Sequence, residues 1–431
     1  MKTDIVIVGC GVSGLYCALN LPPEKKIILI TKSEAEKSDS FLAQGGICVL
    51  RDEEDHDSFF EDTLKAGHYE NDRQSVEIMI GSSREVINDL LKFGVEFERS
   101  NGELIYTREG AHSKPRILFH KDITGKEITS RLLSEARSRK NITLIENCTM
   151  TDLVVEDVQC IGITVKDAKN EFTTVYADYT VLATGGIGGL FKHSTNFPHL
   201  TGDALALAIK HGIALQDIDY IQIHPTTLFT DADDERSFLI SESVRGEGAV
   251  LLNSSGDRFV NELLPRDVVT EAIFAEMQRE GSDHVYLSFA PMPREEIEKH
   301  FPNIKKHCLQ KGYDITKEPI PIVPAQHYFM GGIKVDQNSA TSMNRLFAVG
   351  ETACNGVHGR NRLASNSLLE SLVFAKRAAL EIASEYSPLP LREYKDTPAH
   401  SFSTDEYKKL VLDKIEEAKK LRINKKEKVH E

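Results

Sequence analysis

Residues 4–14 read DIVIVGCGVSG, and this stretch decides the fold. Nearly every position from 4 to 8 is β-branched or apolar, a pattern typical of a parallel strand buried on both faces. Gly9, Gly11 and Gly14 follow with the spacing Gly-x-Gly-x-x-Gly. In such a loop one glycine makes a tight turn, one lets the backbone approach a pyrophosphate, and one allows a helix to pack closely on the strand. The stretch therefore predicts a dinucleotide-binding strand–turn–helix unit, with the helix N-terminus directed at the phosphates.

The segments that follow extend this unit into an α/β fold. The helix is expected to end near Leu21, before two prolines, and residues 27–31 (IILIT) predict the next buried strand. Apolar periodicity predicts helices over 75–93, 125–139 and 366–386. Residues 142–182 are rich in β-formers, and YTVLATGG (179–186) and LFAVG (346–350) predict further buried strands that run into glycines. We therefore expect a Rossmann-like domain.

The order of these segments predicts a discontinuous domain with an insertion. Residues 213–330 carry few long periodic segments, and we interpret them as an inserted α+β capping domain. The Rossmann-like domain then comprises residues 1–212 and 331–388. Residues 389–431 form a short helical tail after a linker marked by Pro388, Pro390 and Pro398. The sequence Ser403-x-x-Glu406 is typical of a capping box, and the tail helix that follows is expected to bury positions 407, 410, 411, 415, 418 and 421.

Composition excludes several classes of protein. The 431 residues include 52 Lys and Arg against 66 Asp and Glu, a net charge of −14, which disfavours a nucleic-acid partner. The seven cysteines form no C-x-x-C pair, so we expect no disulfide scaffold and no metal site. The uncharged run 5–23 lacks basic flanks and ends in two prolines, unlike a targeting segment. No segment predicts a membrane span, and we expect a cytoplasmic protein.

The expected ligand is FAD rather than NAD. The acid that binds the ribose of NAD, about 20 residues after the glycines, is missing, because the second strand ends at Thr31-Lys32. Two further strands end in ATGG (183–186) and AVGE (348–351), which suits a longer ligand. Glu351 is expected to bind ribitol or ribose hydroxyls, although a helix-capping acid remains an alternative.

Two other turns suit the flavin ring. Ala43-Gln44-Gly45-Gly46 allows close backbone approach. The helix that opens at Asn366-Ser367-Leu368, capped by Ser365 or Asn366, would stabilise negative charge on reduced flavin.

Four short motifs far apart in the sequence carry cations and histidines: IHPT (223–226), PRD (265–267), HYFMGG (327–332) and NRLASNS (361–367). Each His alone is more often structural, and each Arg alone is more often a surface ion pair. Together, beside glycine turns in a flavin protein, they indicate a pocket for a dianion. Arg holds a carboxylate through two hydrogen bonds, and His donates to a second carboxylate.

The order of these motifs, with RGEG at 245–248, resembles the succinate dehydrogenase/fumarate reductase flavoprotein family along residues 1–386. Members with covalent FAD usually carry the linking His five residues before the AQGG glutamine. That position is Asp39 here, which implies non-covalent FAD. The segment Arg108-Glu109-Gly110-Ala111-His112-Ser113 resembles the REGxHS motif of the members that oxidise L-aspartate. Glu109 would place a negative charge beside the α-ammonium group of the substrate.

The resemblance implies a reaction and its partners. L-Aspartate would be oxidised to iminoaspartate, with a hydride passing from Cα to N5 of FAD and reoxidation by O2 or fumarate. This is the first step of NAD biosynthesis through quinolinate, and quinolinate synthase is a possible partner. One alternative is a soluble fumarate reductase or succinate oxidase, which needs no amine recognition. A subunit that only relays electrons within a membrane complex is a second alternative.

Site residues follow from the matching motifs. The resemblance implies that His224, His327 and Arg362 hold carboxylates, that Arg266 is the active-site arginine, and that Ser241 and Glu242 border the same pocket. The family uses Lys at the position of Lys32. The implied cofactor set is Gly9, Cys10, Gly11, Val12, Ser13, Gly14, Lys32, Ser40, Gln44, Gly45, Gly46, Asp203, Glu351, Ser367 and Leu368.

Two features depart from the family pattern. Arg360 stands where Ala is usual, which would alter access to the site or add surface charge. The family's C-terminal three-helix domain is expected to be largely missing, since about 40 residues follow position 388.

Overall fold

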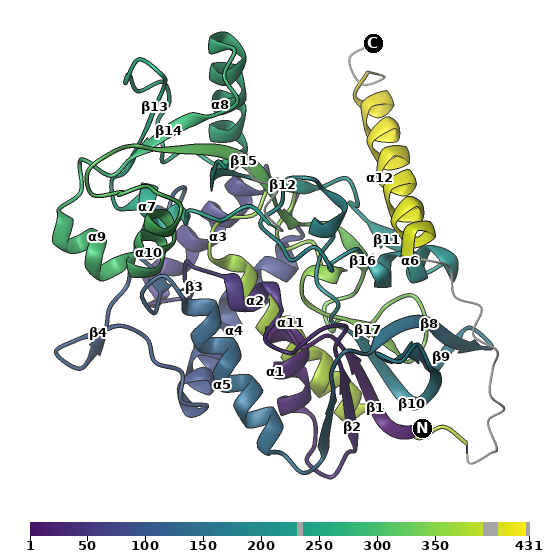
Figure 1. Ribbon diagram of the computed structural model, residues 1–431. Coiled ribbons are helices and arrows are strands. Elements are labelled where there is room, and N and C mark those ends of the chain that lie inside the picture. The colour runs from purple at the N-terminus through teal and green to yellow at the C-terminus, as the bar shows by residue number, and fades with distance from the viewer. Residues whose placement is uncertain (231–235, 391–403, 428–431) are drawn as a thin grey trace.

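The computed structural model describes residues 1–230, 236–390 and 404–427. At its centre lies a seven-stranded sheet in the order β7-β2-β1-β10-β9-β8, with β17 also paired to β10 (Figure 1). Strands β7, β2, β1, β10 and β17 are parallel, whereas β8 and β9 pair antiparallel. The bounds are β7 Ile142–Ile145, β2 Ile27–Ile30, β1 Lys2–Val8, β10 Phe172–Leu182, β9 Gln159–Lys166, β8 Thr149–Glu156 and β17 Leu346–Ala348.

Strand β1 is apolar from Ile5 to Val8 because this part faces a core on each side. Ile5 and Ile7 pack into one cluster, and Val6 and Val8 pack into another. Side chains alternate between the two faces of a strand, so a strand covered on both faces needs apolar residues at consecutive positions. This accounts for the uninterrupted run that the sequence shows.

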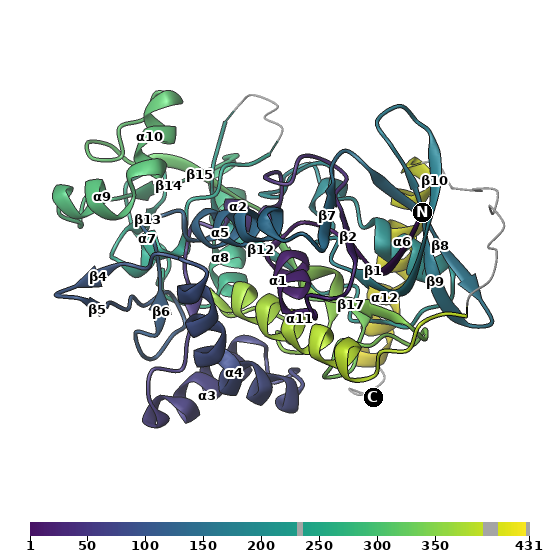
Figure 2. The same ribbon diagram turned by 90° about the horizontal axis from the view of Figure 1, so that it is seen from below.

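Helices cover the Ile5 face of the sheet. Helix α1 packs on α5 and α11, and α11 packs on α4, as Figure 2 shows from below. The second face carries α6 and the C-terminal helix α12, which pack on each other. The bounds are α1 Val12–Asn20, α4 Arg73–Lys92, α5 Thr124–Ser138, α6 Asp203–Lys210, α11 Asn366–Ser384 and α12 Thr404–Glu427.

Helix α12 buries Tyr407, Val411 and Ile415 against the second face, as expected from the sequence. Leu421, predicted to share that face, is instead 56% exposed. The neighbouring residue Arg422 anchors this part of α12 through an ion pair, with its Nε 2.7 Å from Oδ2 of Asp219. The predicted capping residue Ser403 and the linker residue Pro398 lie outside the described residues.

A second, antiparallel sheet lies between residues 221 and 329. Its order is β12-β15-β14-β13, and a separate apolar cluster around Leu251, Ile273 and Ile304 packs against it. Helices α7, α8, α9 and α10 accompany this sheet (Figure 1). The bounds are β12 Ile221–Leu228, α7 Glu242–Gly246, β13 Val250–Leu252, α8 Arg266–Glu280, β14 Val285–Ser288, α9 Arg294–His300, α10 Pro302–Gln310 and β15 Ile320–Phe329.

Short elements connect these layers. They are α2 Asp39–Leu42, β3 Ile47–Cys48, η1 Glu53–Asp55, α3 His56–Ala66, β4 Arg99–Ser100, β5 Glu103–Leu104, β6 Ile117–Leu118, η2 Gly188–Leu190, β11 Leu215–Gln216, β16 Gly332–Lys334, η3 Gly350–Thr352 and β18 Ala353–Cys354. Among the helices of the described ranges, none is long and apolar enough to cross a membrane.

The structure also departs from the sequence predictions in several elements, among them helices α6, α9 and α10, which were not predicted. The strand expected at 179–186 is the second half of β10, which runs without a break from Phe172. Helix α3 was not predicted. Helix α8 escaped prediction because it lacks one apolar face: Val269 and Ile273 are buried, while Val268 and Phe274 are exposed.

Candidate active site

The glycine loop between β1 and α1 is shaped by close backbone contacts. Gly9 has φ +118°, and a Cβ there would lie 2.0 Å from the carbonyl oxygen of Ala183, the residue after β10. A Cβ at Gly14 would lie 2.0 Å from the carbonyl oxygen of Gly9. At Gly11 the nearest atom is the movable hydroxyl of Ser40, at 3.0 Å. Gly9 and Gly14 therefore serve the packing of the loop, while Gly11 opens toward a ligand.

One large cavity starts at this loop and collects the predicted site residues. Of the residues that the sequence assigned to the cofactor, only Gly14 does not line it. The same cavity is lined by every residue predicted for the substrate: Glu109, His224, Ser241, Glu242, Arg266, His327 and Arg362. Segments that are hundreds of residues apart in the sequence thus enclose one continuous space.

Lys32 and Asp203 form a polar pair at the end of the cavity beside β2. The Nζ of Lys32 lies 2.8 Å from Oδ2 of Asp203 and also donates to the carbonyl oxygen of His199 at 2.9 Å. Asp203 sits in the first turn of α6. The cationic side chain thus occupies the position where the sequence lacks a ribose-binding acid.

The N-terminus of α1 faces Ser40. The backbone N–H of Val12 donates to Oγ of Ser40 at 3.0 Å, so this hydroxyl lies where a phosphate would meet the helix N-terminus.

Several buried polar atoms of the cavity lining find no hydrogen-bond partner among the described residues: Oδ2 of Asp39, Oε1 of Gln44, Nε2 of His224 and Nε of Arg362. Burial raises the pKa of Asp39 to about 7. Buried polar groups ordinarily have partners, so these atoms fit a polar ligand in the cavity. With the open glycine at position 11, they fit a dinucleotide with a polar ring system.

Glu351 lies in η3, at the end of β17. Its Oε1 accepts from the backbone N–H of Phe329 at 2.9 Å, and burial, with the neighbouring charge of Asp39, raises its pKa to about 8. A Cβ at Gly186 would lie 2.3 Å from this Oε1, which gives the second glycine of ATGG a steric reason. The carboxyl group lines the cavity rather than capping a long helix.

Ser365 precedes α11 at the N-cap position, but its side chain makes no cap hydrogen bond. Its Oγ accepts from the backbone N–H of Gly46 at 3.2 Å and donates to Oε2 of Glu109 at 2.6 Å. Ser365 is thus the N-cap residue by position, one of the two residues predicted, but its side chain does not cap the helix. The left-handed backbone at Ser365, φ +59°, turns the hydroxyl into the cavity instead.

His224 and His327 lie edge to face, with ring centroids 5.0 Å apart, on the adjacent strands β12 and β15. The Nδ1 of His224 lies 3.2 Å from both the backbone nitrogen and the carbonyl oxygen of Thr226. Its Nε2 lines the cavity and has no partner among the described residues. Burial, followed by the charge of Arg266, holds the pKa of both imidazoles well below the usual value. Both rings are therefore neutral hydrogen-bonding groups.

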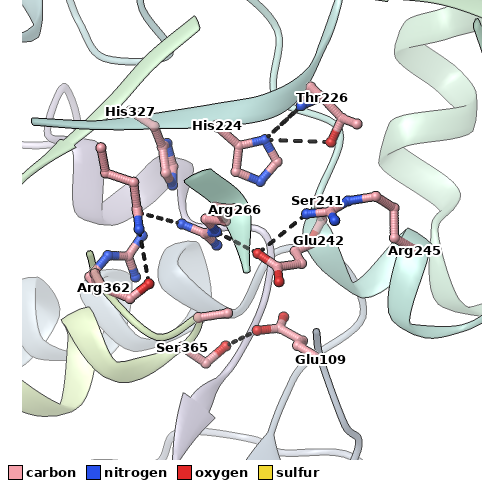
Figure 3. Close-up of polar contacts among 12 residues, drawn as sticks. Glu109, His224, Thr226, Ser241, Glu242, Arg245, Arg266, His327, Arg362 and Ser365 are labelled. Atoms are coloured by element: carbon pink, nitrogen blue, oxygen red, sulfur yellow. Dashed lines mark hydrogen bonds and ion pairs between the residues drawn. The ribbon is translucent and has the colours of Figure 1, made fainter. Parts of the chain in front are cut away.

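Arg362 adds a further cation from the segment before α11 (Figure 3). Its guanidinium stacks 4.3 Å from the ring centroid of Tyr328, and Nη1 donates to Oγ of Ser367 at 2.9 Å. Burial and the charge of Arg266 lower its pKa to about 10, so it stays positive at neutral pH.

Arg266 begins helix α8 and lies near the centre of the group in Figure 3. Its Nε donates to Oε2 of Glu242, and its Nη1 donates to Oε1 of Gln222 at 2.8 Å. Glu242 also lies 3.5 Å from Arg245. Although burial acts to raise the pKa of Glu242, the two guanidinium groups hold it below the usual value, so Glu242 is an anion that orients Arg266.

Glu109 brings a second carboxylate into this otherwise cationic space. It is 3% exposed, and its two oxygens accept hydrogen bonds of 2.6 Å from Ser243 and Ser365. Burial and the nearby Glu242 raise its pKa. A Cβ at Gly45 would lie 2.6 Å from Oε1 of Glu109, so the AQGG turn leaves room for this side chain as well as for a ligand.

Sequence reasoning missed Gln222 and Ser243, which contact site residues directly. Gln222 is two positions before His224 on β12, and this period-two spacing was the available signal. Ser243 had no such signal, because its partner Glu109 is distant in the sequence. Arg360 is exposed and does not line the cavity, so it adds surface charge.

The fold and the cavity define the class as an FAD-binding flavoprotein. A family model described as FAD binding domain matches residues 4–368. FAD is therefore confirmed as the cofactor. Among solved structures, E. coli quinol fumarate reductase FrdA matches with a TM-score of 0.83 and 30% identity, over 90% of this chain and 72% of that one. Mycobacterium smegmatis Sdh1 matches with a TM-score of 0.77 and 33% identity, over 91% and 70%.

Curated relatives narrow the class. The L-aspartate oxidase of Clostridium perfringens is 50% identical over 417 residues, which cover 96% of this chain and 94% of that protein. The L-aspartate oxidase of Synechocystis is 42% identical over 387 residues, covering 87% and 69%. The chain belongs to the L-aspartate oxidase family, within the succinate dehydrogenase/fumarate reductase flavoproteins.

Proposed function

We propose that this chain oxidises L-aspartate to iminoaspartate with FAD, the first step of NAD biosynthesis through quinolinate. One observation carries the proposal. The cavity that holds His224, His327, Arg266 and Arg362 also holds Glu109. Four hydrogen-bond donors suit two carboxylates. Glu242 is paired with Arg266 and Arg245, whereas Glu109 has only serine partners, so Glu109 suits the ammonium group that distinguishes aspartate from succinate.

Different side chains bind different groups of the substrate. Arg362, His224 and His327 are donors for the substrate carboxylates, because Arg362 is charged and the Nε2 of His224 has no partner among the described residues. When bound, FAD would accept the hydride that leaves Cα. The bound ammonium group must first lose one proton, so that its nitrogen lone pair can form the C=N bond, and Glu109 would orient the amine. Clamping both carboxylates orients the Cα–H bond, and this is catalysis by orientation.

Arg266 contributes charge and position rather than a base. Its guanidinium is paired with Glu242 and braced by Gln222, so it is held in one orientation as a cation. A guanidinium stays protonated in proteins, which makes it a poor proton acceptor. It therefore stabilises the negative charge of a substrate carboxylate.

Anaerobic mixing tests the proposal. The purified flavoprotein is mixed with L-aspartate or with succinate, and the flavin absorbance near 450 nm is followed. Bleaching by aspartate is expected. Bleaching by succinate alone would sink the proposal and favour the alternative, a soluble fumarate reductase or succinate oxidase. Glu109→Gln is expected to lose turnover of aspartate while retaining affinity for succinate, and Glu103→Gln, an exposed acid on β5, is the matched control.

The remaining assignments support this function and are proposals too. Residues 1–212 with 331–388 would form the FAD-binding domain, 213–330 a capping domain whose closure excludes water, and 389–431 a helical tail. The separate sheet and apolar cluster within 221–329 support this division. Asp39 at the position of the linking His supports non-covalent FAD, which denaturation followed by filtration would test.

We also propose the reaction's partners. Either O2 or fumarate would reoxidise the flavin, and the compartment would be the cytoplasm. Quinolinate synthase would receive the product, because an imine hydrolyses in water and benefits from direct transfer. Monitoring quinolinate formation in a coupled assay with added catalase and variable dilution would test direct transfer.

A further inference from the structure

Two serine hydroxyls from distant segments hold the carboxylate of Glu109. Ser243, in α7, donates to Oε1 at 2.6 Å, and Ser365, before α11, donates to Oε2 at 2.6 Å. Figure 3 shows the Ser365 contact at the edge of the group. All three side chains belong to buried residues. Each carboxylate oxygen therefore has one serine donor and retains a lone pair for another.

The neighbours of the serines settle which way their protons point. The backbone N–H of Gly46 donates to Oγ of Ser365. The hydroxyl of Ser241 donates to Oγ of Ser243 at 3.1 Å. Since each serine oxygen already accepts a hydrogen bond from a neighbour, its own hydroxyl hydrogen is available to donate to Glu109. Both hydroxyls thus favour the ionised form of the carboxylate, because an ionised carboxylate only accepts hydrogen bonds.

The other groups around Glu109 pull in both directions. Glu242 and burial oppose ionisation of Glu109, whereas Arg266 favours it. Arg245 and the thiol of Cys48 also lie within electrostatic range of the carboxylate. Without the two serine donors, burial and Glu242 would favour a neutral acid that holds an ammonium group weakly.

We infer that Ser243 and Ser365 are positioning residues that keep Glu109 ionised and aimed into the cavity, and that they thereby make the site select a dicarboxylate that carries an ammonium group. This inference rests on the proposed function. It assigns the selectivity for the amine to three residues from three segments rather than to Glu109 alone.

The experiment compares Ser243→Ala and Ser365→Ala with wild type in the FAD-loaded enzyme. The measurements are kcat/KM for L-aspartate from pH 5.5 to 9, and the inhibition constant of succinate, which has no amine. Ser339→Ala is the matched control, because Ser339 is buried and donates only to a carbonyl, that of Phe374. Ser243→Thr restores a hydroxyl. Thr at 365 is avoided because a β-branched residue is strained at positive φ.

Each alanine variant is expected to lower kcat/KM for aspartate about tenfold near pH 6, the effect of one hydrogen bond to a charged group. The acidic limb of the pH profile of kcat/KM should move up by about one pH unit, since the carboxyl group of Glu109 is harder to ionise in the variant. Activity should recover at high pH, and Ser243→Thr should recover at every pH. The inhibition constant of succinate should stay within about twofold.

Parallel loss of aspartate turnover and succinate affinity at every pH would overturn the inference, since it marks a collapsed cavity. An unchanged pH profile, with both alanine variants matching Ser339→Ala, would overturn it while leaving the proposed function intact. Failure of the wild-type flavin to be reduced by aspartate would instead overturn the proposed function, and this inference with it.

Discussion

The guanidinium Nη1 of Arg266 donates a hydrogen bond to Oε1 of Gln222 across 2.8 Å, and the amide nitrogen of the same glutamine donates to Oδ1 of Asn361 at 2.7 Å. Gln222 lies on β12, Arg266 begins α8, and Asn361 precedes α11. One buried amide thus connects the second sheet with the segment that carries Arg362. The orientation of the central arginine depends on a side chain that carries no charge.

Replacing Gln222 by Leu is expected to lower kcat for aspartate about 10- to 100-fold, because a charge-assisted hydrogen bond is lost and Arg266 keeps only Glu242 as its brace. Steady-state kinetics and flavin content measure the effect, with flavin content expected to remain normal. Gln278→Leu, at an exposed position of α8, is the control. A Gln222→Leu enzyme with wild-type kcat would show that Glu242 alone positions Arg266.

The geometry of the glycine loop predicts that alanine substitutions at Gly11 and Gly14 have different effects. Gly14→Ala should destabilise the fold by about 2–4 kcal/mol, because its Cβ meets backbone at 2.0 Å. Gly11→Ala should leave the melting temperature of the flavin-free protein nearly unchanged but weaken FAD binding at least about tenfold, since its Cβ meets only a movable hydroxyl and a bound phosphate needs that space.

Thermal unfolding and FAD titration separate the two glycine variants. Gly81→Ala on α4 serves as the control, because nothing lies within 4 Å of a Cβ there and Ala favours a helix. Equal effects of Gly11→Ala and Gly14→Ala on stability would contradict the division of roles.

Lys32 is expected to contribute to FAD affinity through its charge beside Asp203. Lys32→Met should raise the Kd for FAD about tenfold, since one charge-assisted contact is lost. The kcat at saturating FAD should change little, because Lys32 lies near α6 and away from the cationic group. Titration of the flavin-free protein measures Kd, and Lys26→Met at an exposed site is the control. Unaltered affinity would mean that Lys32 serves only Asp203.

Glu370 predicts a pH dependence of stability. It is a buried residue of α11, and burial raises its pKa to about 7, against about 4.3 in an unfolded chain. Between these values the folded state holds a proton that the unfolded state releases. The contribution of Glu370 to the free energy of unfolding is therefore complete below about pH 4.3 and is lost as the pH rises toward 7.

Glu370→Gln should flatten this dependence, because the amide does not ionise. From pH 5 to 7.5 the melting temperature of the wild type is expected to fall about 2–5 °C more than that of the variant. Differential scanning fluorimetry across this range measures the slopes, with the exposed Glu385→Gln as control. Identical slopes for wild type and Glu370→Gln would refute the assignment.

Much of the fold and site was predictable because the signals are local. The strand and glycine turn at 4–14 depend on residues that are close neighbours in the sequence. The structure places β1 and the start of α1 there. The motifs around His224, Arg266, His327 and Arg362 indicated a pocket for a dianion, and the structure brings all four to one cavity. Helix α8 and the exposed Leu421 were not predictable, because tertiary packing overrides local periodicity.

The sequence by itself determined the strand–turn–helix unit, FAD as the cofactor, and the residue types of the site, since spacing and turn chemistry act over a few residues. Only the tertiary structure decided that the side chain of Ser365 binds Glu109 instead of capping α11, and that Ser243 joins it from α7. These partners are more than 100 residues apart in the chain. No local pattern records such contacts, because they exist only where separate layers of the fold pack against one another.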